Sequence, residues 1–156
     1  MPSAFPLLRR RGVKNYMKLL AAIFAISISF TVSAQSADEA AVRKILAEQT
    51  ASWNKGNLED FMRGYWQSDS LMFIGTNGVT YGYQNTLNNY KKNYGTPDKM
   101  GKLYFKLLKV QRLSSEYYFV VGKWQLIRNA GNVGGHYDLI FRKINGKWVI
   151  ISDHSS

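Results

Sequence analysis

The sequence contains no cysteine, and only three of its 156 residues are proline. The absence of cysteine excludes disulfide scaffolds, thiolate metal sites, cysteine nucleophiles and lipid attachment through cysteine. Acidic residues are also few, with ten against 21 lysines and arginines, and there are only two histidines. The chain has no Walker loop, GxSxG elbow, dinucleotide fingerprint or HExxH motif. With 14% aromatic residues, a chain of this length can still bury a sizeable core.

The N-terminal residues 1–34 follow the order of a secretory signal. Basic residues between Arg9 and Lys18 precede the apolar run Leu19–Phe30, which is shorter than the roughly 20 residues of an ordinary transmembrane helix. Small residues follow at Val32–Ala34. We therefore expect export to the periplasm or the cell exterior, cleavage after Ala34, and no stable membrane insertion afterwards. An uncleaved anchor and a start at Met17 remain alternatives.

Five basic residues of the remaining chain recur every three or four positions in a stretch that otherwise reads as strand. Removing residues 1–34 leaves 16 basic and 10 acidic residues, a net charge of +6. A nucleic-acid module would need interleaved aromatics and a groove-reading element, and export argues against that partner. We interpret the repeated cations as a solvated sheet face, attracted at most weakly to anionic surfaces. They are Lys99, Lys102, Lys106, Lys109 and Arg112.

The first half of the mature chain has helical periodicity. Capping-box spacing at Ser36–Glu39 predicts a helix that ends near Gly56. Apolar residues at Leu58, Phe61, Met62 and Tyr65 predict a second helix beginning after Asn57. A third helix is expected over residues 83–94.

The second half has a period of two, typical of strands. A strand at Leu71–Ile74 precedes the tight-turn signal Asn77–Gly78. Four longer strands are expected at Leu103–Leu113, Tyr117–Arg128, His136–Ile144 and Trp148–Ser152. Helices followed by a meander of strands indicate one α+β domain over residues 35–156, with the helices on one face of an antiparallel sheet.

Four segments resemble the nuclear transport factor 2-like superfamily, and within it the SnoaL-like, ketosteroid-isomerase-like bacterial domains. They are Trp53–Phe61, Gly78–Gly82, Gly122–Leu126 and Gly146–His154. The resemblance implies a cystatin-like cone in which a curved sheet wraps the helices around one apolar pocket. It also implies a homodimer formed through the outer face of the sheet.

The residues do not match the isomerase mechanism of that superfamily. Ile74 and Leu139 stand where the resemblance places its two acids, and Gln49 stands where it places an oxyanion tyrosine. Enolisation needs a base and preorganised donors, which the first two side chains cannot supply. Ketosteroid-type isomerisation is therefore not expected. Tyr65 and Tyr90 correspond to tyrosines that support such pockets.

The most polar cluster near an apolar strand is Ser152–Ser156. Because neighbouring strand residues point to opposite faces, Asp153 and His154 cannot both enter one cavity. Extending the strand from Val149 and Ile151 places Asp153 with the apolar set and His154 outside. Either residue could act as an acid or base, although a terminus tied down by hydrogen bonds is the simpler interpretation.

His136 and Asp138 could join His154 in a zinc site, since their types suit zinc. Their spacing carries no ligand signature, and a surface hydrogen bond between imidazole and carboxylate explains the pattern equally well. We expect no metal and no cofactor.

Aromatic residues could form either a cavity wall or a packed core. The set comprises Trp53, Trp66, Trp124, Trp148, Tyr65, Tyr90, Tyr104 and Tyr137. Trp124 lies near Gly122, whose missing side chain would leave space beside the indole on a central strand.

The sequence favours an exported domain that binds a small apolar or aromatic molecule. The expected ligand-binding residues are Gln49, Trp53, Tyr65, Tyr90, Trp124, Tyr137 and Asp153. A lyase- or isomerase-type enzyme using Asp153 or His154 as its base is one alternative. A dimeric assembly domain without a ligand is another.

The leader yields a direct prediction. Intact-mass measurement of the protein from its own host should show a mature chain that begins at Gln35, because signal peptidase reads the small residues up to Ala34. A full-length product embedded in the membrane would contradict this prediction.

Overall fold

The computed structural model describes residues 37–156, and Glu39–Ser156 form one compact unit. The expected signal at residues 1–34 and the capping residue Ser36 lie outside the described residues. Within the described part, the structure contains no helix with the length and apolar character of a membrane span.

The helices occupy the first half of the unit and the segment before the long strands. A helix covers residues 37–54 and is followed by α2 (Leu58–Met62), α3 (Tyr83–Tyr94) and α4 (Pro97–Met100). Gly56 adopts a φ of 78° in the turn after the first helix, a conformation that glycine reaches without strain. The side chain of Asn57 then caps α2 by accepting the backbone N–H of Asp60 at 2.9 Å. The short α4 was not predicted.

The second helix ends earlier than its apolar periodicity predicted. It stops at Met62, and Tyr65 lies in an extended segment that bridges to Ile150. The N–H of Ile150 donates to the Gly64 carbonyl, and the N–H of Trp66 donates to the Ile150 carbonyl, both at 2.9 Å. A Cβ on Gly64 would stand 2.9 Å from the side chain of Ile45. The missing side chain at Gly64 therefore allows the chain to pack closely on the first helix at the point where it leaves α2 and joins the sheet.

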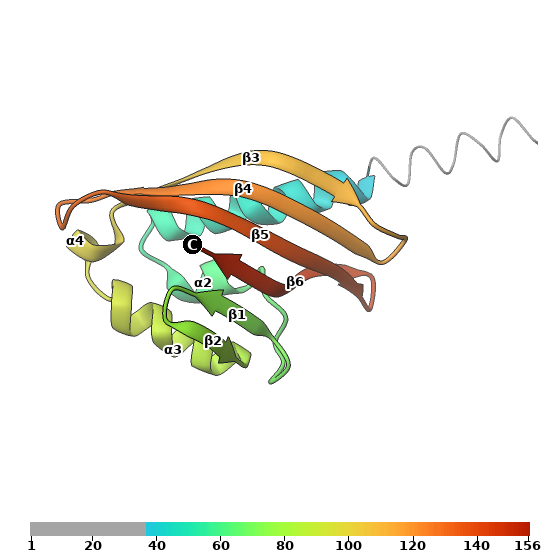
Figure 1. Cartoon of the computed structure of the whole chain (residues 1–156), viewed down its shortest axis with the longest axis horizontal. Coiled ribbons are helices and arrows are strands. Elements are labelled where there is room, and N and C mark those ends of the chain that lie inside the picture. Colours follow the sequence, from blue (N-terminus) through green and yellow to red (C-terminus); the bar gives the residue numbers. More distant parts are fainter. Residues whose placement is uncertain (1–36) are drawn as a thin grey trace, which may run out of the picture. The chain divides into compact units, whose positions relative to one another are not determined.

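The sheet has six strands in the order β2-β1-β6-β5-β4-β3 (Figure 1). The strands are β1 (Met72–Gly75), β2 (Gly78–Tyr81), β3 (Lys102–Arg112), β4 (Tyr117–Ile127), β5 (Val133–Ile144) and β6 (Lys147–Ser155). The last four form the predicted antiparallel meander, which short turns impose on consecutive strands. β1 instead pairs with β6 in parallel, so the sheet is mixed. Only consecutive strands joined by tight turns must be antiparallel, and β1 and β6 are far apart in the sequence.

The helices cover one face of the curved sheet, and the core lies between the two layers (Figure 1). Inward side chains of β4, β5 and β6 alternate with outward ones, as the period of two predicts. Tyr118, Phe141 and Ile150 are fully buried on this inner face, and Met62 of α2 is buried in the same core. The expected α+β fold with a curved sheet is confirmed.

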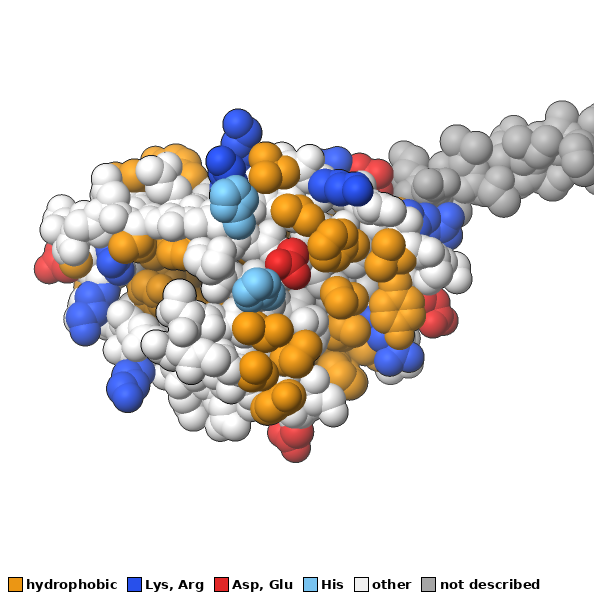
Figure 2. Space-filling model, viewed as in Figure 1, with side chains coloured by type: hydrophobic (Ala, Val, Ile, Leu, Met, Phe, Trp, Pro, Cys, Tyr) orange, Lys and Arg blue, Asp and Glu red, His pale blue; other side chains and the backbone are white. Residues whose placement is uncertain are grey.

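The outer face of the sheet carries many apolar side chains around a polar centre (Figure 2). In the register of β4, β5 and β6, Val121 stands opposite Asp138, which in turn stands opposite His154. A homodimer through this face stays a prediction. The five cations predicted to form a solvated face are all exposed, and all except Lys99 lie on the edge strand β3.

Candidate functional site

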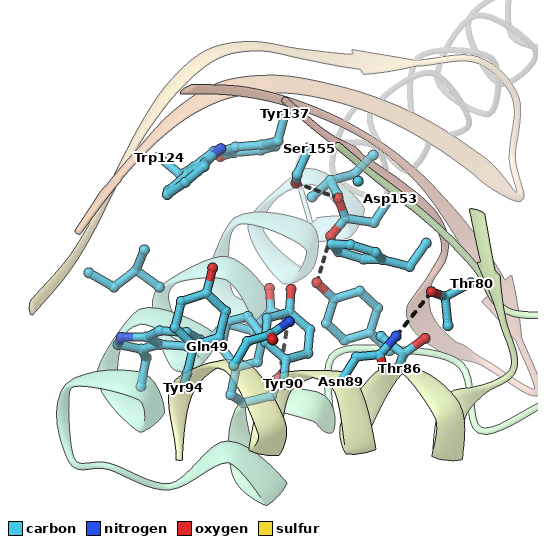
Figure 3. Close-up of a pocket in the computed structure, with 18 of the residues that line it drawn as sticks. Gln49, Thr80, Thr86, Asn89, Tyr90, Tyr94, Trp124, Tyr137, Asp153 and Ser155 are labelled. Atoms are coloured by element: carbon cyan, nitrogen blue, oxygen red, sulfur yellow. Dashed lines mark hydrogen bonds between the residues drawn. The ribbon is translucent and has the colours of Figure 1, made fainter. Parts of the chain in front are cut away.

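A cavity of about 300 Å³ lies between the helices and the inner face of the sheet. In Figure 3, Trp124, Tyr137 and Asp153 approach it from the sheet, and Tyr90 and Tyr94 approach it from α3. Aromatic side chains dominate its wall. They are Trp53, Phe61, Tyr65, Phe73, Tyr90, Tyr94, Phe105, Trp124 and Tyr137.

The structure brings all seven predicted ligand-binding residues to this one cavity. They are Gln49 and Trp53 of the first helix, Tyr65 after α2, Tyr90 of α3, Trp124 of β4, Tyr137 of β5 and Asp153 of β6. Their contact with a ligand stays a prediction. Three other aromatics considered for the wall, Trp66, Tyr104 and Trp148, are not part of it. Tyr104 is 57% exposed.

Asp153 is the acidic group of the cavity wall, and its side chain is only 4% exposed. The Tyr65 hydroxyl donates to Oδ2 of Asp153 at 2.6 Å, and the Ser155 hydroxyl donates to Oδ1 at 2.8 Å. Burial raises the pKa of Asp153 to about 6, although these two hydrogen bonds oppose the rise. The carboxylate is therefore poised to gain or lose a proton near neutral pH.

A β-bulge turns Asp153 inward. The buried apolar residues of β6 are Trp148 and Ile150, so strict alternation from them would send Asp153 to the outer face. The register with β5 shifts between the pairs Phe141↔Ile150 and Ile140↔Ser152, which leaves Ile151 as an extra residue. The prediction that Asp153 faces inward is confirmed, but Val149 and Ile151, from which it was extrapolated, are not in the buried set.

His154 lies on the outer face, as predicted, and does not reach the cavity. Its Nδ1 lies 3.0 Å from Oδ1 of Asp138 on the neighbouring strand. The surface hydrogen bond predicted for this cluster thus joins these two residues, and His136 is exposed beside them. Across residues 37–156 no three His, Asp or Glu side chains group closely enough to hold a metal ion.

Two tyrosines extend the hydrogen-bonded group of Asp153 towards the helices. Tyr65 interacts with both Asp153 and the Tyr90 hydroxyl. Because a phenol has a single proton, Tyr65 uses it on the carboxylate, and its oxygen can accept from Tyr90. Burial and the charge of Asp153 raise the pKa values of both phenols, so they remain protonated donors.

Tyr137 fills the space that the sequence predicted beside Trp124. Its ring lies against Gly122 on the paired strand, where a Cβ would stand 2.3 Å from the phenol oxygen. The hydroxyl is buried and has no hydrogen-bond partner among the described residues. Burial, followed by the charge of Asp153, raises the pKa of Tyr137, so this hydroxyl also keeps its proton. An unpaired buried hydroxyl is uncommon in proteins.

Other polar groups of the wall are held by the backbone. The Gln49 amide nitrogen donates to the Phe61 carbonyl at 3.2 Å, and the Trp53 indole donates to the Met100 carbonyl at 3.2 Å. The Trp124 indole donates to the Ser156 carbonyl at 3.3 Å. These contacts hold the wall in place. Asp153 adds an ionisable carboxyl group to it, and Tyr137 adds a hydroxyl group without a partner among the described residues.

Sequence reasoning missed the polar side of the cavity. Thr86, Asn89 and Asn93 lie on the same face of α3 as Tyr90, so helical periodicity could have identified them. Asn89 donates to the hydroxyl of Thr80 on β2 at 3.1 Å.

On β1 the lining residues are Phe73 and Gly75, so Ile74 was the wrong position to compare with an isomerase base. Leu139 of β5 does line the cavity. Neither Phe73 nor Leu139 is an acid, so the mismatch with the isomerase mechanism remains.

The raised pKa of Asp153 predicts a measurable effect on stability. The folded-state pKa of about 6 exceeds the ordinary value of 3.8, so ionisation destabilises the fold as the pH rises from about 4 to above 6. Asp153→Asn cannot ionise. The unfolding free energy of the wild type should fall between about pH 4.5 and 7.5. That of Asp153→Asn should fall less over the same range, by about 2 kcal/mol. Urea denaturation at both pH values measures this difference.

Asp138→Asn is the matched control, because it removes a carboxylate from the outer face of the same sheet. The charge of Asp138 raises the pKa of Asp153 less than burial does, so this control should keep most of the pH dependence. Identical pH profiles for Asp153→Asn and the wild type would show that Asp153 titrates normally.

Solved structures provide the comparison with known proteins. An NTF-2 like protein of unknown function from Shewanella oneidensis is 37% identical, with a TM-score of 0.72 over 78% of this chain and 98% of its own. A cystatin-like domain of unknown function from Nostoc punctiforme is 19% identical, with a TM-score of 0.67 over 77% of this chain and 76% of its own. The hexachlorocyclohexane dehydrochlorinase LinA-type3 from Novosphingobium barchaimii is 14% identical, with a TM-score of 0.66 over 79% of this chain and 88% of its own.

A scan against models of protein families found no match, and a search of curated proteins found none. The last two structural neighbours share the fold alone. The Shewanella protein is similar in sequence over almost its whole length, and this shows that the chain belongs to the nuclear transport factor 2-like family.

Proposed function

We propose that the chain binds a small, largely apolar or aromatic molecule in its cavity. A volume of about 300 Å³ is at the lower end of the range of small-molecule sites. The wall combines apolar and aromatic side chains with a smaller set of polar groups, as small-molecule sites do.

The observation that carries this proposal is a buried carboxylate facing an open, aromatic-lined space. A domain that served only assembly would gain stability by filling that space, because empty volume forfeits packing contacts. It would also gain by replacing Asp153 with an apolar residue, since burying a carboxylate without a counter-charge is unfavourable. Both features lower stability. A bound molecule would fill the open space and interact with the carboxylate, which would explain why both are present.

A second candidate is an enzyme that removes a proton from carbon, as in a lyase or isomerase. Asp153 supports it, because a carboxylate with a pKa of about 6 is matched to proton transfer near neutral pH. Asp153 would hold the proton. The electron pair left on the substrate carbon would either form a double bond as a leaving group departs from the adjacent carbon with its own electron pair, or move onto a neighbouring carbonyl oxygen as an enolate that is later reprotonated. The Novosphingobium dehydrochlorinase is an enzyme of the same fold, although the likeness to this chain is one of fold alone.

Solvent-deuterium incorporation into phenylacetone, followed by NMR, tests the enzyme candidate. If Asp153 is the base, Asp153→Asn should slow incorporation by about 100-fold or more. Asp138→Asn is again the control and should leave the rate unchanged. A wild type that is no faster than buffer would reject this candidate. We also expect no turnover of a β,γ-unsaturated ketosteroid.

Trp124 tests the binding proposal, because its half-buried ring forms part of the wall. Trp124→Phe should weaken binding of the neutral probe N-phenyl-1-naphthylamine several-fold. Its cost in unfolding free energy should be about 1 kcal/mol, below the roughly 3–5 kcal/mol of emptying an aromatic site. Probe fluorescence and urea denaturation measure the two effects.

Trp148→Phe makes the same chemical change outside the cavity, where the indole packs edge-to-face on Tyr118 at 5.1 Å. It should lower stability and leave probe binding intact. A wild type that binds no probe, together with a Trp124→Phe variant that unfolds far more easily, would reject the cavity as a binding site.

A further inference from the structure

The cavity wall has an unusual balance of charge. Among the described residues that line it, Asp153 is the one acidic side chain, and none is Lys, Arg or His. The remaining polar groups are uncharged, such as the amides of Asn77 and Asn89 and the hydroxyl of Thr80. When Asp153 is ionised, the lining side chains therefore carry one negative charge and no positive charge.

Asp153 is stabilised mainly by hydroxyl groups, and His154 adds only a smaller, through-space electrostatic effect on its pKa. Its hydrogen-bond donors Tyr65 and Ser155 are both neutral. The neighbouring imidazole of His154 points to the outer face and contacts Asp138 instead. Buried carboxylates in proteins are normally paired with a positive charge or coordinate a metal. The counter-charge of Asp153 is thus missing from the wall, and the open space lies beside the carboxylate.

The aromatic side chains favour the same kind of occupant. The rings of Trp53, Phe61, Tyr90 and Tyr94 form one cluster, with centroids 5.0–6.0 Å apart in the pairs that touch. Ring faces are electron-rich and attract cations, most strongly where water is excluded. The unpaired hydroxyl oxygen of Tyr137 can in addition accept an N–H group.

We propose that the ligand of this cavity is a small organic cation, an amine or quaternary ammonium group carried on an apolar body. The proposal rests on the binding function proposed above and adds the charge of the ligand. Asp153 supplies the counter-charge, and the ring cluster surrounds the apolar part. An anionic ligand would meet a buried carboxylate and no lining cation, so the cavity excludes it.

The positive net charge of the mature chain does not oppose this inference at short range. Exposed charges are largely screened beyond about 8–10 Å at physiological salt. The lysines and arginine of β3 are exposed at the edge of the sheet and are not lining residues. Inside the cavity the field is therefore set mainly by Asp153 and the surrounding rings.

Three probes that differ mainly in charge test the proposal. Benzyltrimethylammonium and neopentylbenzene have nearly the same shape, but only the first is charged, and 3-phenylpropanoate is an anion of similar size. Titration calorimetry and tryptophan fluorescence should show that the wild type binds the cation at least about tenfold more tightly than the neutral isostere. The anion should not bind measurably. Asp153→Asn should bring the cation and its isostere to within about threefold, whereas the Asp138→Asn control should keep the preference.

Each result decides a different claim. Equal or tighter binding of neopentylbenzene by the wild type would overturn the cation proposal and leave the apolar binding function standing. Failure of all three probes to bind would overturn both. A preference for the cation that survives Asp153→Asn would overturn the role of the carboxylate. The ranking of the three probes in the wild type decides the matter even if Asp153→Asn does not fold.

Discussion

The hydrogen bond from Tyr65 to Asp153 is the interaction on which the site depends. A buried carboxylate without a counter-charge would be strongly unfavourable in an apolar cavity. The 2.6 Å contact with Tyr65 and the 2.8 Å contact with Ser155 lower that cost but do not remove it. Hydrogen bonds to ionised groups are stronger than those between neutral groups, so the pair also fixes the position of the carboxylate.

Two local irregularities of the backbone make this hydrogen bond possible. The helix before Tyr65 ends at Met62, and the chain joins the sheet beside Ile150. On β6, the bulge at Ile151 shifts Asp153 to the inner face, where Phe73 of the parallel strand β1 is its register partner. A regular β6 strand would direct Asp153 to the outer face instead. Bulges next to functional sites commonly re-aim a side chain in this way.

These irregularities also mark where sequence reasoning reached its limit. Local periodicity predicted the long strands and α3, and the structure contains them. Local chemistry predicted the turn at Gly56 and Asn57, which the structure also contains. Periodicity cannot reveal a bulge. Asp153 faces inward, as predicted, but it does so because of the bulge at Ile151 and not because of regular alternation. The early end of α2 coincides with the close packing of Gly64 on Ile45 of the first helix, a tertiary contact that apolar periodicity does not show.

A nuclear magnetic resonance titration of the Asp153 carboxyl carbon would test the central claim most directly. In the free protein the midpoint should lie near pH 6, because burial raises the pKa of this carboxyl group. Saturation with benzyltrimethylammonium should lower the midpoint, since a nearby positive charge favours the ionised form. A midpoint close to the ordinary value of 3.8, unchanged by the cation, would contradict the account of Asp153 as an uncompensated charge in a ligand cavity.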